Sequence, residues 1–242
     1  MTALPRARGA ELMDEPDVDR GQLALSLADL RGVNRWLGGT RVVLHHLARM
    51  AARLPGKEMT VLDVATGSGD IPLHVARWAR GRGLRARVTA TDAHVGTLAL
   101  AREHAGRDAD VRVEHADALA LPYADREFDF ALCSTALHHF ADEDAVQVLR
   151  ELDRVARLGV VVNDLRRSRP ALLGARLLAA TVWRTHPVTR HDGPLSVRRS
   201  FTPRELLDLG RRAGMREAQV HAHQPFRLAL VADRTRGPAG AA

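Results

Sequence analysis

The sequence predicts an α/β fold with a doubly wound, mostly parallel sheet. Short apolar segments alternate with helical ones between residues 57 and 165, the pattern of strands joined by crossover helices. A Gly-x-Gly turn directly follows the first apolar segment, as where a strand runs into a helix beside an open crevice. The 242 residues suffice to bury a full core, which favours one domain with appendages.

The residues before the sheet form two expected units. Residues 1–18 are mixed in character and contain proline and glycine, which predicts a flexible lead. Leucine spacing from residue 19 onward predicts two amphipathic helices, broken near Gly38 and Gly39 and ending before a Pro-Gly pair.

The alternating core follows in order. Strands are expected at 59–64, 86–91, 111–115, 128–133 and 158–163, with helices at 70–80, 95–104 and 142–156.

The regular alternation of strands and helices ends after Asp164. An Ala/Leu-rich helix is expected at 170–184 and a loop with Pro and Gly at 185–200. A helix begins at Thr202-Pro-Arg-Glu, where Thr is the cap, and ends at Gly214. Expected strands at 215–221 and 226–231 close the sheet as an antiparallel hairpin, and 234–242 are expected to fray.

Bulk composition limits the possible partners. The formal net charge is +7, but Lys57 is the only lysine and the arginines are spread along the chain. Aromatic residues make up 4%, too few for base-stacking platforms, so we expect no nucleic-acid partner. No apolar run is long enough for a membrane span, and the N-terminus lacks the apolar core of a signal peptide. The single cysteine, Cys133, is expected in a buried strand, and the composition favours a cytoplasmic monomer or homodimer.

The Gly-x-Gly turn lies in residues 61–70, Val-Leu-Asp-Val-Ala-Thr-Gly-Ser-Gly-Asp. No lysine follows as a phosphate-binding Walker loop requires, and Pro72 replaces the third glycine of the dinucleotide fingerprint. Asp70 in the first helical turn repels a pyrophosphate but attracts an ammonium. The turn therefore predicts a zwitterionic or cationic ligand.

Four segments in register carry a family resemblance. Residues 63–70 resemble motif I of the class I S-adenosylmethionine (SAM) methyltransferases, with Ala65 in place of the first glycine, as in the ubiquinone/menaquinone-biosynthesis group. Segments 88–92, 115–123 and 128–134 resemble the second strand, the adenine-contacting segment and the fourth strand of that family. The resemblance covers roughly residues 34–165 and extends to natural-product small-molecule methyltransferases.

The resemblance implies SAM as the cofactor and a seven-stranded, Rossmann-like methyltransferase fold. Its parts would be a helical lid at 19–56, a SAM-binding core at 57–165, an acceptor-pocket insertion at 166–200 and the rest of the core at 201–233. The implied cofactor-binding residues are Asp63, Ala65, Thr66, Gly67, Gly69, Asp92, Ala93, Asp117, Ala118 and Ser134.

Individual roles follow for three acids. Asp63 would engage the amino group of SAM, Asp92 the ribose hydroxyls and Asp117 the adenine amino group. Asp92 is also suited to capping the next helix, and Asp117 to an Asx turn.

Candidate catalytic residues follow the fourth and fifth strands. His138 and His139 come after the fourth strand and Asp164 ends the fifth, so all three should meet at one sheet edge. An imidazole paired with a carboxylate serves as a general base near neutral pH, and the pattern is similar to that of small-molecule O-methyltransferases. A purely structural role for the histidines is the alternative.

Candidate acceptor-pocket residues lie outside the core. Asn34 and Trp36 belong to a segment similar to the part of ubiquinone-type enzymes that folds over the cofactor, and His186 and His191 lie in the expected loop. No His, Cys, Asp or Glu set has convincing metal-ligand spacing, so no metal is predicted.

Three functions remain open. The first is methyl transfer from SAM to a hydroxyl of a small, apolar or aromatic secondary metabolite, with a His/Asp base. The second is C-methylation of a quinone-like or polyketide ring, and the third is a SAM-binding module without catalysis. An NAD-dependent enzyme is disfavoured by Pro72.

Overall fold

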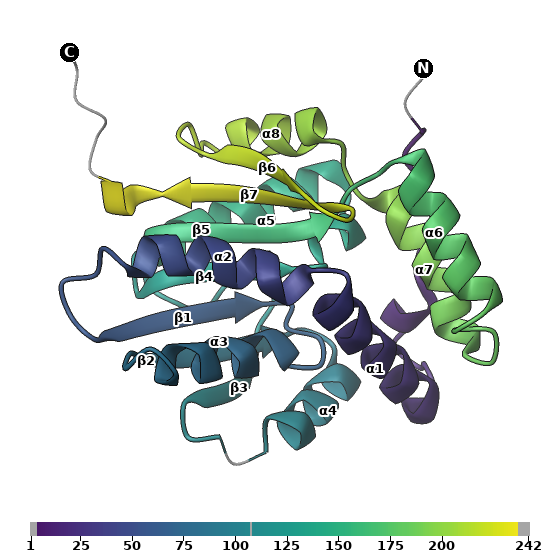
Figure 1. Ribbon diagram of the computed structural model, residues 1–242, viewed down its shortest axis with the longest axis horizontal. Helices are drawn as coiled ribbons and strands as arrows, with labels where there is room; N and C mark the ends of the chain where they lie inside the picture. Colours follow the sequence, from purple (N-terminus) through teal and green to yellow (C-terminus); the bar gives the residue numbers. More distant parts are fainter. Residues whose placement is uncertain (1–3, 107, 237–242) are drawn as a thin grey trace.

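The computed structural model describes residues 4–106 and 108–236 as a seven-stranded sheet covered by helices on both faces (Figure 1). The strand order is β3-β2-β1-β4-β5-β7-β6. The first five strands are parallel, and β7 runs antiparallel to both β5 and β6. The predicted α/β fold with its closing hairpin is therefore confirmed.

The strands have the following bounds: β1 Glu58–Val64, β2 Arg85–Asp92, β3 Val111–His115, β4 Phe128–Ser134, β5 Ala156–Leu165, β6 Gln219–His223 and β7 Arg227–Asp233. The helices are α1 Arg20–Trp36, α2 Gly39–Ala51, α3 Asp70–Arg80, α4 Val95–Ala105, α5 Asp142–Val155, α6 Arg169–Ala180, α7 Pro187–Arg199 and α8 Pro203–Arg212. Short 3-10 helices lie at Leu12–Asp14, Leu137–His139 and Arg234–Arg236.

The core forms on both faces of the sheet. One cluster joins β4 and β5 to the buried faces of α5 and α8, and the other joins β1 and β4 to those of α2 and α3. Every residue of β4 before Ser134 is buried, including Cys133, as expected of a central parallel strand covered on both sides. This packing fixes the carboxyl ends of the parallel strands, where the loops of the site begin.

Helix α1 lies beyond the carboxyl ends of these strands (Figure 1). The chain turns between α1 and α2 at Gly38, whose φ of 86° is in the left-handed region that favours glycine. The break was predicted at this position. A Cβ on the next residue, Gly39, would stand 2.4 Å from Oδ1 of Asn34, so this close approach also requires glycine.

Two expectations for the outer segments are wrong. The region 185–200 is not a loop but contains α7, with Pro187 at its first turn and Pro194 inside it. Its packing compensates for the poor local propensity, because Gly193 lies so close to the Trp183 ring that a Cβ there would stand 2.6 Å from a ring carbon.

The lead is also more ordered than predicted. The main-chain N–H of Ala7 donates to the carbonyl of Arg198, and Asp192 of α7 accepts the N–H groups of Leu12 and Met13. Glu11 is only 1% exposed. Residues 4–14 are thus packed against α7. Of the predicted frayed tail at 234–242, Arg234–Arg236 form a 3-10 helix, and residues 237–242 lie outside the described residues, as do residues 1–3.

Candidate cofactor and acceptor site

A polar cleft of about 340 Å³ opens at the carboxyl ends of β1, β2 and β4. Nine of the ten residues expected at a cofactor line it: Asp63, Ala65, Thr66, Gly67, Asp92, Ala93, Asp117, Ala118 and Ser134. Gly69 does not line the cleft. It caps α3 with a φ of 71°, so its role is to turn the chain into the helix.

The loop from β1 to α3 is held by the neighbouring strand. The N–H of Gly67 donates to Oδ2 of Asp92 at 3.0 Å, and the N–H of Thr66 donates to the carbonyl of Thr91 at 2.8 Å. Ala65 has a φ of 54°, an unfavourable conformation for a residue with a Cβ. Such strain is typical of ligand-binding loops whose surroundings enforce the geometry.

Five carboxylates line the cleft and make it acidic: Asp14, Asp63, Asp70, Asp92 and Asp117. Burial raises the pKa of Asp63 to about 7, and the charges of Asp70 and Asp92 add to the rise, although a hydrogen bond from Thr66 opposes it. Burial also raises the pKa of Asp92. Oδ1 of Asp63 is buried and has no hydrogen-bond partner among the described residues. An acidic cleft with an orphaned carboxylate oxygen suits a cationic group.

The acids Asp92 and Asp117 are already partly engaged. Asp92 accepts one main-chain N–H on each oxygen, and the cap of α4 is His94 rather than Asp92. Asp117 is exposed and forms the Asx turn that was its alternative role, with the N–H of Leu119 at 2.9 Å. Each carboxylate oxygen carries two lone pairs, so both residues can still accept bonds from a ligand.

Asn34 connects α1 to the cleft. Its Nδ2 donates to Asp70 at 3.2 Å, and its Oδ1 accepts bonds from Thr135 and Arg227. Arg227 is fully buried and also donates to Thr135 at 2.7 Å; burial lowers its pKa to about 10. Four segments distant in sequence meet at this amide. Asn34 was expected in the acceptor pocket, but it lines the polar cleft and not the apolar cavity described below.

A second, mainly apolar cavity of about 340 Å³ lies beside the cleft. Helices α1, α6 and α7 provide much of its wall, through residues such as Val33, Leu178 and Val197. Polar groups gather at one end, where Glu11, His138 and His139 line it.

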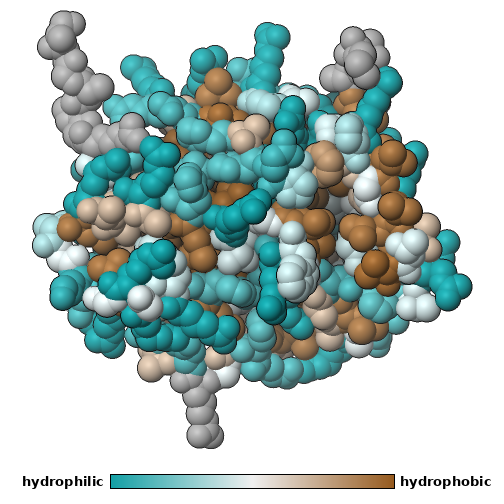
Figure 2. Space-filling model, in the orientation of Figure 1, coloured by the Kyte–Doolittle hydropathy of each residue, from teal (hydrophilic) through white to brown (hydrophobic). Residues whose placement is uncertain are grey.

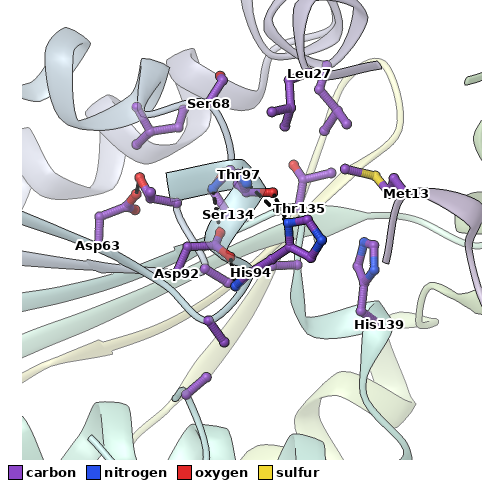
Figure 3. A pocket seen from close by; sticks show the side chains of 18 of the residues that line it. Met13, Leu27, Asp63, Ser68, Asp92, His94, Thr97, Ser134, Thr135 and His139 are labelled. Atoms are coloured by element: carbon purple, nitrogen blue, oxygen red, sulfur yellow. Dashed lines mark hydrogen bonds between the residues drawn. The ribbon is translucent and has the colours of Figure 1, made fainter. Parts of the chain in front are cut away.

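The cleft and the cavity share four lining residues: Met13, Leu30, Thr135 and His139. Figure 3 shows Met13 and His139 at one end of the cleft, with Asp63 and Asp92 toward the other. A group bound in the cleft and a molecule in the cavity would therefore meet beside His139.

His138 and Asp164 form the expected pair. Nδ1 of His138 lies 2.7 Å from Oδ1 of Asp164, and both side chains are buried. The other ring nitrogen, Nε2, lies 3.5 Å from a carboxylate oxygen of Glu11. Burial opposes protonation, but the charges of Asp164 and Glu11 outweigh it and raise the pKa of His138 to about 10. His138 is therefore held as an imidazolium at neutral pH, which leaves it no lone pair with which to act as a base.

His139 is the more accessible imidazole. Its Nδ1 lies 2.6 Å from Oδ2 of Asp14, which orients the ring, and its Nε2 lies 3.7 Å from Oε2 of Glu11. The side chain is 19% exposed, against 1% for His138. Of the two histidines, His139 thus has the geometry of a group that reaches a bound molecule.

Glu11 is the residue that sequence reasoning missed. It contacts both histidines and accepts a hydrogen bond from Ser196 at 2.8 Å, and the nearby imidazoles hold its pKa down at about 2 although burial alone would raise it. The sequence feature that could have indicated Glu11 is the segment 11–14, Glu-Leu-Met-Asp, in which two acids flank two apolar residues.

Three expected pocket residues lie elsewhere. Trp36 is 75% exposed and lines neither cavity. His186 bonds Asp29 at 2.7 Å and so ties α7 to α1, while His191 pairs with Asp192. Trp36 lies at the end of α1. The expected loop is α7 with its N-cap His186, and neither of the two histidines lines the cleft or the cavity.

Comparisons with known proteins match part of this chain. Residues 61–159 match the family described as a methyltransferase domain. The demethylmenaquinone methyltransferase of Deinococcus radiodurans is 36% identical over 113 residues, which cover 46% of this chain and 44% of that protein. The enzyme of the same name from Thermus thermophilus is 40% identical over 100 residues, covering 41% and 43%. The matches thus span less than half the length of these relatives.

Solved structures share the fold over most of the chain. A SAM-dependent methyltransferase from Aquifex aeolicus superposes with a TM-score of 0.61 and 19% identity, covering 89% of this chain and 98% of its own. Human N-acetylserotonin methyltransferase, solved in complex with SAM, superposes with a TM-score of 0.65 and 18% identity, covering 89% and 56%. The chain is therefore similar to methyltransferases over the matched residues, and it shares the fold of solved SAM-dependent methyltransferases over most of its length.

Proposed function

We propose that this protein transfers the methyl group of SAM to a hydroxyl of a small, largely apolar acceptor. The observation that supports it most is the shared wall between the acidic cleft and the apolar cavity, where His139 borders both. A non-catalytic SAM-binding module would not need a second cavity that ends in polar groups beside the first.

The acidic cleft suits SAM. The orphaned oxygen of Asp63 would accept from the ammonium group, Asp92 from the ribose hydroxyls and Asp117 from the adenine amino group. When bound, SAM would supply an electrophilic methyl group: an in-line nucleophile bonds to the methyl carbon as the carbon–sulfur bond breaks and the neutral thioether leaves.

The protein contributes the proton acceptor and its orientation. We assign proton acceptance to Nε2 of His139, because Asp14 fixes Nδ1 of that ring and the buried His138 is already protonated. Asp164, Glu11 and His138 then serve as the buried frame that holds the segment bearing His139. This assignment moves the predicted His/Asp base from the His138–Asp164 pair to His139 with Asp14.

The apolar cavity sets the acceptor class. The lining of the cavity is mainly apolar, although its wall also contains Ser26, Thr189, Asp192 and Ser196. The acceptor therefore needs a largely apolar body with a polar group that reaches His139. We therefore propose alkylated or aromatic hydroxy compounds, such as those of secondary metabolism, as acceptors.

C-methylation of a quinone-like ring is the second candidate. It is favoured by the demethylmenaquinone methyltransferases among the relatives, whose name implies a quinone acceptor. The two proposals differ in the atom that accepts the methyl group, which is a hydroxyl oxygen in the first and a ring carbon in the second.

Incubation with isotopically labelled SAM and a panel of alkylated phenols and quinols tests both. Product analysis by mass spectrometry and NMR distinguishes an O-methyl from a C-methyl group. An O-methylated product supports the first proposal and a C-methylated product the second. Binding of SAM without transfer to any acceptor in the panel or in a lipid extract would reduce the protein to a SAM-binding module.

A further inference from the structure

The outer face of α6 and the turn after it exposes apolar side chains. Leu173 is 71% exposed, Leu177 63% and Val182 62%. Leu173 and Leu177 are four residues apart and so lie on the same side of the helix. The opposite side of α6 is buried in a small core of its own with α7. Figure 2 shows hydrophobic residues gathered on this side of the molecule, over α6 at the right of the view.

The same segment is rich in arginine and free of acids. Residues 165–191 contain six arginines and neither aspartate nor glutamate, although the chain has 29 acidic residues in all. Arg169, Arg176 and Arg184 are exposed. Among the described residues, the pair of Arg167 with Glu205 is the single ion pair that these arginines form. The surface therefore joins apolar side chains to uncompensated positive charge.

This surface is continuous with the apolar cavity. Leu177, one of the exposed side chains, also lines the cavity, as do its neighbours Gly174 and Leu178. An isolated exposed leucine is ordinary, whereas a cluster at the mouth of an apolar cavity marks a contact surface. A partner bound to this face of α6 would therefore lie next to the opening of the apolar cavity.

We propose that α6 and the turn after it dock on the surface of an anionic lipid bilayer. Leucine and valine side chains would enter the interface while the surrounding arginines contact lipid phosphates, the arrangement of amphipathic helices that lie on membranes. A segment that contributes arginines and no acids complements an anionic bilayer, whereas a protein partner would need acids placed to match the arginines. No helix in the described ranges is long and apolar enough to cross a membrane, so the contact is peripheral.

The benefit of membrane docking for the site depends on the proposed function. An apolar acceptor dissolved in the bilayer would pass between α1 and α6 into the cavity without crossing water. Docking itself does not require methyl transfer, so the two proposals fail separately.

Vesicle sedimentation tests the docking. The full chain is mixed with phosphatidylcholine vesicles, with or without phosphatidylglycerol, at low and high salt. We expect partitioning onto the anionic vesicles that weakens with salt. The double variant Leu173→Ser, Arg176→Glu should partition at least about tenfold less, because it loses an inserted side chain and reverses a charge.

The matched control lies on α4. The variant Val95→Ser, Arg102→Glu makes the same two changes at exposed positions, Val95 being 72% exposed, and should partition like the natural protein. Equal loss in both variants would mean that the net charge alone causes adsorption and would overturn the proposal, as would no partitioning of the natural protein.

SAM binding by calorimetry verifies that each variant is folded. If the α6 variant does not fold, Val182→Ser with Arg184→Glu makes the same test on the following turn. Vesicle binding without methyl transfer to any acceptor would contradict the proposed function alone. Transfer to dispersed phenols without vesicle binding would contradict the docking alone.

Discussion

The carboxylate of Asp164 binds His138 twice, through Nδ1 of the ring at 2.7 Å and through the main-chain N–H at 3.0 Å. The two bonds join the end of β5 to the turn after β4. Glu11 faces the other side of the same ring, so the imidazole lies between two carboxylates. The two adjacent histidines therefore differ: His138 is buried between carboxylates and charged, whereas His139 is accessible.

The first prediction concerns stability at alkaline pH. The pKa of His138 is about 10 in the folded protein, against 6.5 for a histidine in the unfolded chain. Between these two pH values, only the folded state holds the proton on His138. The free energy of unfolding should therefore fall as pH rises from about 6.5 to about 10, by up to about 1.4 kcal/mol per pH unit. His138→Gln should flatten that decline, as measured by urea unfolding at several pH values.

The matched control for that experiment is His45→Gln. His45 is exposed on α2, so its replacement should leave the alkaline decline as in the natural protein. An unchanged slope in His138→Gln would mean that His138 is not protonated in the folded state.

The second prediction separates binding from transfer. His139→Ala should lower kcat by about 10²- to 10⁴-fold, the usual contribution of a general base, with little change in SAM affinity. His45→Ala is the control and should keep full activity. Initial rates with labelled SAM and calorimetric SAM titrations give the two quantities. Full activity of His139→Ala would instead favour transfer to a carbon or to an already ionised oxygen.

Periodicity predicted the layers of this fold because local pattern and tertiary burial agree there. The bounds of α3 and β3 are those expected, and the other parallel strands differ by no more than two residues at either end. The carboxyl-end loops follow from the strand order, so the cleft and the His138–Asp164 pair could be placed from sequence alone.

The acceptor side could not be predicted for a physical reason. Helix α7 contains Gly193 and Pro194, which disfavour a helix, and its stability comes from contacts with α1, α6 and the lead. Glu11 reaches the site through Ser196, 185 positions away in the sequence. Contacts of this range have no periodic signature. The sequence therefore indicated an acceptor-pocket insertion at 166–200 but neither helix α7 within it nor the part played by Glu11.

The third prediction concerns the pH dependence of SAM binding. Burial raises the pKa of Asp63 to about 7, so without a bound cation the carboxylate is protonated below that pH. A cationic ligand prefers the ionised form, so SAM affinity should weaken as pH falls through 7. Asp63→Asn should bind weakly at all pH values and lose this dependence.

Asp117→Asn provides the contrast, because Asp117 also lines the cleft but is exposed, whereas Asp63 is buried. Asp117→Asn should weaken SAM binding by a similar factor at every pH from 6 to 8, so SAM affinity should still fall as the pH falls through 7. Calorimetric titrations at several pH values decide between these outcomes. A dependence retained in Asp63→Asn would assign it to a different group.

The last prediction tests the junction of lid and cleft. In Gly39→Ala the new Cβ would stand 2.4 Å from Oδ1 and 3.0 Å from Cα of Asn34, so that side chain must move. Its bonds to Asp70 and Arg227 would be lost, and we expect destabilisation of about 1–3 kcal/mol together with weaker SAM binding. Gly32→Ala is the control, because a Cβ there meets nothing within 4 Å and alanine favours the α1 helix. Thermal unfolding and SAM titration of both variants measure the difference. Equal behaviour of the two would mean that Asn34 does not couple the lid to the cofactor cleft.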